Sequence, residues 1–200
     1  MVGIPSSSII SIWEIGMQYF RTRLESRADI QAALILGILS AIESDRMGQS
    51  IDEYAIKRLL RMLISLGLYH TKFEEPFLID TERFFIKEGQ VMIESCDPAD
   101  FLIHTERRIA EAIDMTNKYL DASTKHSLLS RVESCLIVPH VNQIVDKGFI
   151  PLIDADRIAD LRRMYVLFDR VGSADCVKIG WMDYMKKAGE DLMREKEKNL

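Results

Sequence analysis

Apolar residues recur along most of the chain at every third or fourth position, which is the spacing of one face of an α-helix. No stretch alternates apolar and polar residues with the period of two that a half-buried strand requires. Because helices alone must then supply the packing, the sequence predicts an all-α fold. The expected helices cover residues 9–27, 29–45, 51–67, 75–95, 98–120 and 124–149, followed by one from about 154 and a last one from about 175.

Several polar residues, glycines and prolines predict where these helices begin and end. Ser50 and Glu53 have the spacing of a capping box, in which each side chain satisfies a backbone NH at a helix start. Gly67 is placed to adopt the left-handed conformation that ends a helix. Pro98 follows an aspartate and suits the first position of the next helix.

Three further residues interrupt the pattern after residue 124. Pro139 either kinks the predicted helix 124–149 or restarts it, because proline cannot donate the backbone hydrogen bond of a helix interior. Gly148 and Pro151 predict the next turn, since glycine and proline are the strongest breakers of regular structure.

Charge and cysteine content argue against several classes of function. The net charge is -5, and the 31 acidic residues are interleaved with 26 basic ones. The sequence therefore predicts no basic surface that could neutralise nucleic-acid phosphates. The cysteines Cys96, Cys135 and Cys176 are far apart and odd in number, which favours free thiols in a reducing compartment over a disulfide framework. We therefore expect no nucleic-acid partner and a location in the cytoplasm and nucleus.

The sequence predicts neither a signal peptide nor a membrane span. The stretch from Met1 to Ile12 lacks a basic region, and Glu14 interrupts the apolar residues that follow. The most apolar internal run, Ile30 to Ile42, is shorter than the roughly 20 residues that cross a bilayer. This run is expected to form a buried helix, and no membrane partner is expected.

No residue pattern indicates catalysis, a metal or a cofactor. No two of the four histidines are one helical turn apart, there is no CxxC pair, and no glycine-rich phosphate loop is present. His70 with Glu74 and His104 with Asp100 have the spacing of a helical turn, but one such pair supplies too few metal ligands. We predict surface or capping histidines and no enzyme activity.

The aromatic residues leave one question open. Phe73, Phe77, Phe84 and Phe85 recur at helical spacing, which is more typical of core packing than of a ligand pocket. Trp13 lies in the first amphipathic helix, with Ile9, Ile15, Met17 and Phe20 as its other apolar residues. It either packs in a core or contacts a partner.

Four stretches of the chain together resemble the N-terminal region of the cullin family. They are IWEIGMQYFRTRL (12–24), FEEPFL (73–78), YLDAST (119–124) and DLRRMYVLFDRV (160–171). Their order and spacing also match, and the similarity covers almost all of the chain. Within the family, the first stretch and the connection from Gly67 to Phe73 are most similar to cullin-4.

The resemblance implies stacked five-helix cullin repeats that form a stalk. Residues 1–27 would hold the last helix of the first repeat, 28–153 the second repeat and 154–200 the start of the third. In the family, the N-terminal end of the stalk binds a substrate-receptor adaptor, and a distant C-terminal domain holds the RING subunit. The implied function is a non-catalytic scaffold segment of a cullin-RING E3 ubiquitin ligase. The alternative is a truncated, stand-alone interaction module or decoy without ligase activity.

The likeness to cullin-4 also implies partners and contact residues. The adaptor would be a damage-binding β-propeller protein, which the family contacts through the second and fifth helices of the first repeat and an N-terminal arm. This sequence carries only the counterpart of the fifth helix, so Ile12, Trp13 and Met17 are the implied adaptor contacts. A RING-binding domain is not recognised in the sequence, so the RING subunit is expected only through a C-terminal domain outside it.

Overall fold

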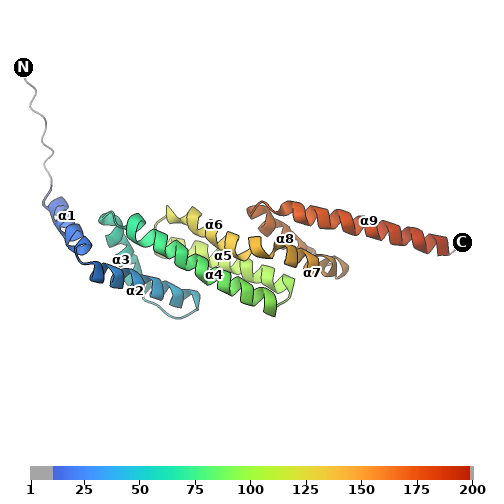
Figure 1. Cartoon of the computed structure of the whole chain (residues 1–200), viewed down its shortest axis with the longest axis horizontal. Helices are drawn as coiled ribbons and strands as arrows, with labels where there is room; N and C mark the ends of the chain where they lie inside the picture. Colours follow the sequence, from blue (N-terminus) through green and yellow to red (C-terminus); the bar gives the residue numbers. More distant parts are fainter. Residues whose placement is uncertain (1–10, 199–200) are drawn as a thin grey trace, which may run out of the picture. The chain divides into compact units, whose positions relative to one another are not determined.

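The computed structural model describes residues 11–198, except for the side chains at 191, 192 and 195–198. Within this range the chain consists of helices and short connections without strands, so the all-α prediction is confirmed (Figure 1). A π-helical segment (Tyr69–Glu74) precedes α4, and a 3₁₀ turn (Val138–His140) precedes α7. The helices are α1 (Ile12–Glu25), α2 (Ala28–Arg46), α3 (Glu53–Ser65), α4 (Glu75–Ser95), α5 (Pro98–Lys118), α6 (Thr124–Leu136), α7 (Val141–Asp154), α8 (Ile158–Arg170) and α9 (Ala174–Lys198).

The chain divides into two compact units. Unit 1 comprises residues 1–77 and 118–121, and unit 2 comprises residues 78–117 and 122–200. Among the described residues, unit 1 contains α1, α2, α3 and the π-helical segment, and unit 2 contains α6 to α9 together with most of α4 and α5. Because these units are defined by contacts and the repeats by family likeness, the predicted repeat boundaries stay a prediction.

The core of unit 1 forms between the apolar faces of α2, α3 and the segment that follows. Ile42 and Leu60 are fully buried, and each lies on the face that its helix turns towards the others. The Tyr69 and Phe73 rings lie tilted at 49° with centroids 5.2 Å apart, and the Phe73 and Phe77 rings stack with centroids 5.4 Å apart. All three rings are buried, so this part of the aromatic stripe is packing, as the sequence predicts.

Two hydrogen bonds attach the segment after α5 to the rest of unit 1. The Tyr119 hydroxyl donates to Asp45 Oδ2 at 2.9 Å, and the Asp121 backbone NH donates to the Tyr69 hydroxyl at 3.2 Å. Burial and the nearby Asp45 carboxylate raise the pKa of Tyr119, so the tyrosine stays a neutral donor. Both bonds join residues more than 50 positions apart and therefore fix the register of this segment.

The core of unit 2 is also helical and carries a buried charged cluster. Arg108 on α5 donates to both Glu88 oxygens on α4, at 3.1 and 3.0 Å from its Nε. Burial alone would raise the pKa of Glu88, but hydrogen bonds from His104 and Arg108 hold it below its usual value. The largest fully buried side chains of unit 2 are Phe101, Phe168, Leu102 and Leu128.

The prediction of surface or capping histidines is wrong for two of the four. His104 and His140 are both buried. His104 Nε2 lies 3.4 Å from Glu88 on α4, and no bond to Asp100 is seen. His140 packs edge-on against the ring of Phe101, and burial lowers its pKa. Both environments are created by residues from other helices, which spacing along one helix does not reveal.

The start of α3 differs from the predicted capping box. The helix begins at Glu53, and Asp52 rather than Ser50 is the capping residue, with its side chain accepting from the Ala55 NH at 2.9 Å. Aspartate caps a helix start as well as serine does, and here it lies directly before the first helical residue. The predicted end is confirmed, because Gly67 has a left-handed φ of 66°.

The predicted helix 124–149 is two helices. Pro139 lies in the 3₁₀ turn that separates α6 from α7, so the helix ends before this proline and a new helix begins after it. The predicted turn at Gly148 and Pro151 is wrong, since both residues lie inside α7. Gly148 is explained by packing: a Cβ there would lie 2.6 Å from the Cβ of Pro98, at the start of α5. The turn follows α7, where Asp156 has a positive φ of 52°.

We expect Tyr119→Phe to lower the free energy of unfolding by about 1–2 kcal/mol, because it removes the bond to Asp45 while keeping the buried ring. Urea denaturation measures this change. Tyr54→Phe is the matched control and should change stability by less than about 0.5 kcal/mol, because Tyr54 is exposed. Equal effects of the two variants would contradict the role given to the Tyr119 hydroxyl.

Gly148→Ala should destabilise the protein by about 1–3 kcal/mol, because the added methyl group overlaps Pro98 and forces α5 and α7 apart. Thermal unfolding provides the comparison with Gly189→Ala on α9, where nothing lies within 4 Å of the new Cβ. The control should be stabilised by roughly 0.5–1 kcal/mol, because alanine favours a helix more than glycine does. A Gly148→Ala variant as stable as the parent would show that the contact is not tight.

Candidate functional site

The first turn of α1 is fixed by a capping box, which the helix predicted over residues 9–27 did not include. Glu14 NH donates to Ser11 Oγ at 3.1 Å, and the Ser11 NH donates to Glu14 Oε2 at 2.7 Å. The bond from the Ser11 backbone lowers the pKa of Glu14, which keeps the carboxylate ionised near the positive end of the helix. The sequence signal was present as serine followed three residues later by glutamate. The helix therefore begins at Ile12 and presents Ile12 and Trp13 from an ordered turn.

Most apolar side chains of α1 are exposed. Ile12 is 90% exposed and Trp13 is 66% exposed, whereas Met17 is half-buried. Trp13 is thus not a core residue among the residues that the structure describes. The expected apolar face of this helix is only partly a packing face, because Ile15 and Phe20 are exposed as well. Ile9, the first residue of that face, lies outside the described residues.

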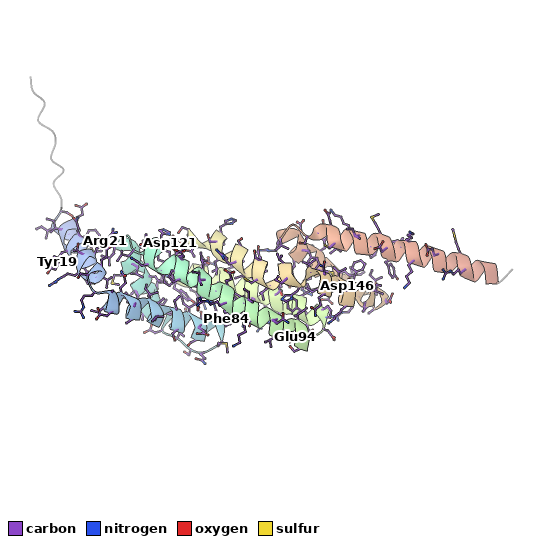
Figure 2. All side chains as sticks on the ribbon, viewed as in Figure 1. Tyr19, Arg21, Phe84, Glu94, Asp121 and Asp146 are labelled. Atoms are coloured by element: carbon purple, nitrogen blue, oxygen red, sulfur yellow. The ribbon has the colours of Figure 1, made fainter. Side chains whose placement is uncertain are left out.

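The C-terminal half of α1 attaches the helix to unit 1. Leu24 is its one buried residue. Arg21 reaches the end of α3, where its Nη1 would lie 3.1 Å from a Cβ built on Gly67. A cation at that position interacts favourably with the carbonyl end of the α3 dipole. Figure 2 labels Arg21, together with Tyr19, which is 64% exposed on α1. The attachment leaves the N-terminal half of α1 uncovered.

Two open hollows flank the helix. One, of about 400 Å³, lies between α1 and the end of α3, and its lining is mostly polar, with Met17 and Leu66 as its apolar residues. The other, of about 370 Å³, lies where α1 meets α2 and is lined by Phe20, Leu24 and Ile30 together with Arg23 and Arg27. Exposed apolar side chains beside shallow hollows are typical of a surface that contacts another protein.

The exposed residues of α1 suit contact with another protein, and the described residues give no indication of a catalytic or metal site. In residues 11–190 and the two described side chains beyond them, no group of three or more histidine, cysteine or acidic residues could hold a metal ion. The three cysteines are free, and burial raises the pKa of Cys96 and Cys135. Raised pKa values keep thiols protonated and poorly nucleophilic. Across the part of the chain that the structure describes, no helix is both long and apolar enough to span a membrane.

The comparisons with known proteins give a consistent match. A model of the cullin alpha solenoid domain matches residues 4–199. Human Cullin-4A is 35% identical over 197 residues, which cover 98% of this chain and 26% of that protein. Cullin-3 of Dictyostelium discoideum is 29% identical over 204 residues, covering 98% and 26%. Cullin-like protein 5 of Arabidopsis thaliana is 28% identical over 189 residues, covering 93% and 44%. The chain spans about a quarter of the length of the first two.

We expect Trp13→Ala to change the free energy of unfolding by less than about 0.5 kcal/mol, because this side chain is mostly solvated in the chain alone. Leu24→Ala should cost about 2–3 kcal/mol, because it empties the buried contact that holds α1. Chemical denaturation of both variants measures the contrast. A large loss for Trp13→Ala would assign the tryptophan to the core and remove it from the candidate surface.

Proposed function

The chain belongs to the cullin family, and from this premise we propose that it is a scaffold segment of a cullin-RING E3 ubiquitin ligase with no catalytic step of its own. The match over residues 4–199 supports this proposal most directly. The higher identity to Cullin-4A than to Cullin-3 favours a cullin-4-like scaffold. The free, widely spaced cysteines are consistent with the proposed location in the cytoplasm and nucleus, where thiols stay reduced.

The proposed role is mechanical. Helices that bury their apolar faces against one another resist bending, so a stalk made of them keeps a bound substrate and the ubiquitin donor within a fixed reach. Under this proposal, residues 28–153 form the second cullin repeat, between the end of the first and the start of the third. The RING subunit is contacted by a further C-terminal domain and not by these residues.

We also propose that α1 contributes to binding of the substrate-receptor adaptor, which for a cullin-4-like scaffold is a damage-binding β-propeller protein. The supporting observation is Trp13, a large side chain that is 66% exposed at the end of an ordered helix. Tryptophan is enriched among the few residues that supply most of the binding energy of an interface. Ile12 beside it and Met17 one turn later would extend the contact.

A second proposal is a stand-alone interaction module or decoy, which occupies the adaptor without recruiting a RING subunit. It is favoured by the match to Cullin-like protein 5, of which this chain covers 44% compared with 26% of Cullin-4A. Because the matched region makes up a larger share of Cullin-like protein 5, a similar region also occurs in a shorter protein than Cullin-4A. Both proposals place the adaptor on α1, and they differ in whether a RING subunit joins the complex through a C-terminal domain outside these residues.

Trp13→Ala should weaken binding of purified β-propeller adaptor by at least about tenfold, because a buried interface tryptophan contributes about 2 kcal/mol or more. Isothermal titration calorimetry against the full chain measures the dissociation constant. Trp181→Ala is the matched control, because Trp181 is the other tryptophan and is also exposed, but lies on α9. The control should bind as the parent does.

Adaptor binding that survives Trp13→Ala, or that is lost equally in Trp181→Ala, would remove α1 as the adaptor contact. The same preparation then tests the division of roles proposed for the stalk. Co-expression with adaptor and RING subunit should recover the adaptor alone if these residues lack the RING contact. Recovery of a RING subunit by this chain would contradict the division of roles proposed for the stalk.

A further inference from the structure

The connection between α2 and α3 contains a serine that does not have the structural role its spacing suggests. Ser50 lies three residues before Glu53, as in a capping box. The side chain of Asp52 caps α3 instead, by accepting from the Ala55 NH at 2.9 Å. Because Asp52 satisfies this backbone group, the start of the helix does not need the Ser50 hydroxyl.

The backbone around Ser50 is open to another protein. Gly48 has a left-handed φ of 74°, which turns the chain away from the end of α2. Residues 49–52 then form an irregular connection that is neither helix nor turn, and residues 47–50 are all exposed. An active site that binds its substrate as an extended chain therefore reaches Ser50 without unfolding the interior of a helix.

The residues that follow Ser50 carry only negative charge. Asp52 lies two positions after the serine and Glu53 three, and no residue from 47 to 51 is charged. Both acidic residues are exposed. Glu53 also pairs with Lys118 at 3.0 Å, but both side chains of this pair are solvated, so the contact is weak. Protein kinases select their substrates by such charge patterns, here one that a basic pocket beside the kinase active site would read.

Glu53 is the first residue of α3, so little structure has to open for both acids to be read. Helix ends open locally at low cost in free energy, because they have few buried contacts. Only this first residue needs to leave the helix for residues 49–53 to lie extended in a kinase. The core of α3, which begins at the buried Ile56, stays in place.

We propose that Ser50 is a phosphorylation site for an acid-directed serine kinase. In this reaction the Ser50 Oγ bonds to the γ-phosphorus of ATP, the bond between that phosphorus and the β–γ bridging oxygen breaks, and ADP leaves. The hydroxyl proton passes to the catalytic aspartate of the kinase. This chain supplies the nucleophile and the acidic residues that direct the kinase to it. The inference does not rest on the proposed function.

The structure distinguishes Ser50 from other residues with the same spacing. Among residues 11–198, a serine or threonine precedes an acidic residue by three positions at six further places. Ser11 Oγ accepts from an NH in the first turn of α1, and Ser26 Oγ donates to the Arg23 carbonyl at 2.8 Å at the end of that helix. The other four lie inside helical segments: Thr22, Ser40, Thr71 and Ser130. All six therefore belong to a helix or cap one, whereas Ser50 does neither.

The phosphate changes the charge of this surface without removing a bond that holds α3. A phosphoserine carries about −1.5 to −2 charges at pH 7. It would lie beside the carboxylates of Asp52 and Glu53, and the positive end of the α3 dipole offsets part of their repulsion. Because Asp52 remains the cap, the start of α3 becomes more acidic while the helix keeps its first turn.

Phosphorylation of the folded full chain tests the site. A purified acid-directed serine kinase of the casein kinase type, with ATP and Mg²⁺, should transfer a phosphoryl group that mass spectrometry of the digested product locates at Ser50. Ser50→Ala should lower the initial rate at least about tenfold. This variant retains the six other residues with the same spacing, so the loss would show that the folded structure selects Ser50. Ser26→Ala is the matched control and should leave the rate unchanged.

Two further substitutions test the charge pattern. Asp52→Asn removes one charge and keeps a residue that caps a helix start, and Glu53→Gln removes the other. Combined, they should lower kcat/KM for the kinase at least about tenfold. The proposal is overturned if Ser50 stays unmodified while the same kinase phosphorylates an acidic control peptide. A rate that Ser50→Ala does not lower, or that the two charge substitutions do not lower, also overturns it.

Discussion

The whole structure depends on the burial of one apolar face per helix. Each helix of unit 1 and unit 2 satisfies its own backbone hydrogen bonds, so the packing between helices supplies the stability that a short helix lacks in water. Fully buried residues such as Ile42, Leu60 and Phe168 lie where those faces meet. Within residues 11–198, α1 leaves part of its apolar surface exposed at Ile12 and Trp13.

Buried polar groups add specificity to this packing. The Tyr119 bond to Asp45 and the Arg108 bonds to Glu88 each join two helices or segments at one register. A shift along either contact would leave a buried polar group without its partner, which costs more free energy than the bond itself contributes. These contacts therefore select one arrangement of the helices among the many that apolar stripes alone would permit.

The sequence predicts most of the fold because periodicity is a local property. The positions of the helices, the left-handed Gly67 and the start of α5 at Pro98 all follow from residues close in sequence. The errors at Gly148 and His104 arise where a distant residue decides, whereas the Asp52 cap of α3 is a local feature. Gly148 resembles a helix breaker until Pro98 is seen packed against it, and His104 resembles a surface residue until Glu88 is placed beside it. The candidate site was predictable only in part, because exposure of Trp13 depends on which helices surround α1.

We propose that this family member binds its adaptor through the exposed residues of α1. Hydrogen–deuterium exchange of the chain, with and without the purified β-propeller adaptor, tests it most directly. We expect the adaptor to slow exchange at the amides of α1, Ile12–Glu25, while exchange in α9 stays the same. Slower exchange confined to α9, or no change anywhere in the presence of bound adaptor, would contradict it.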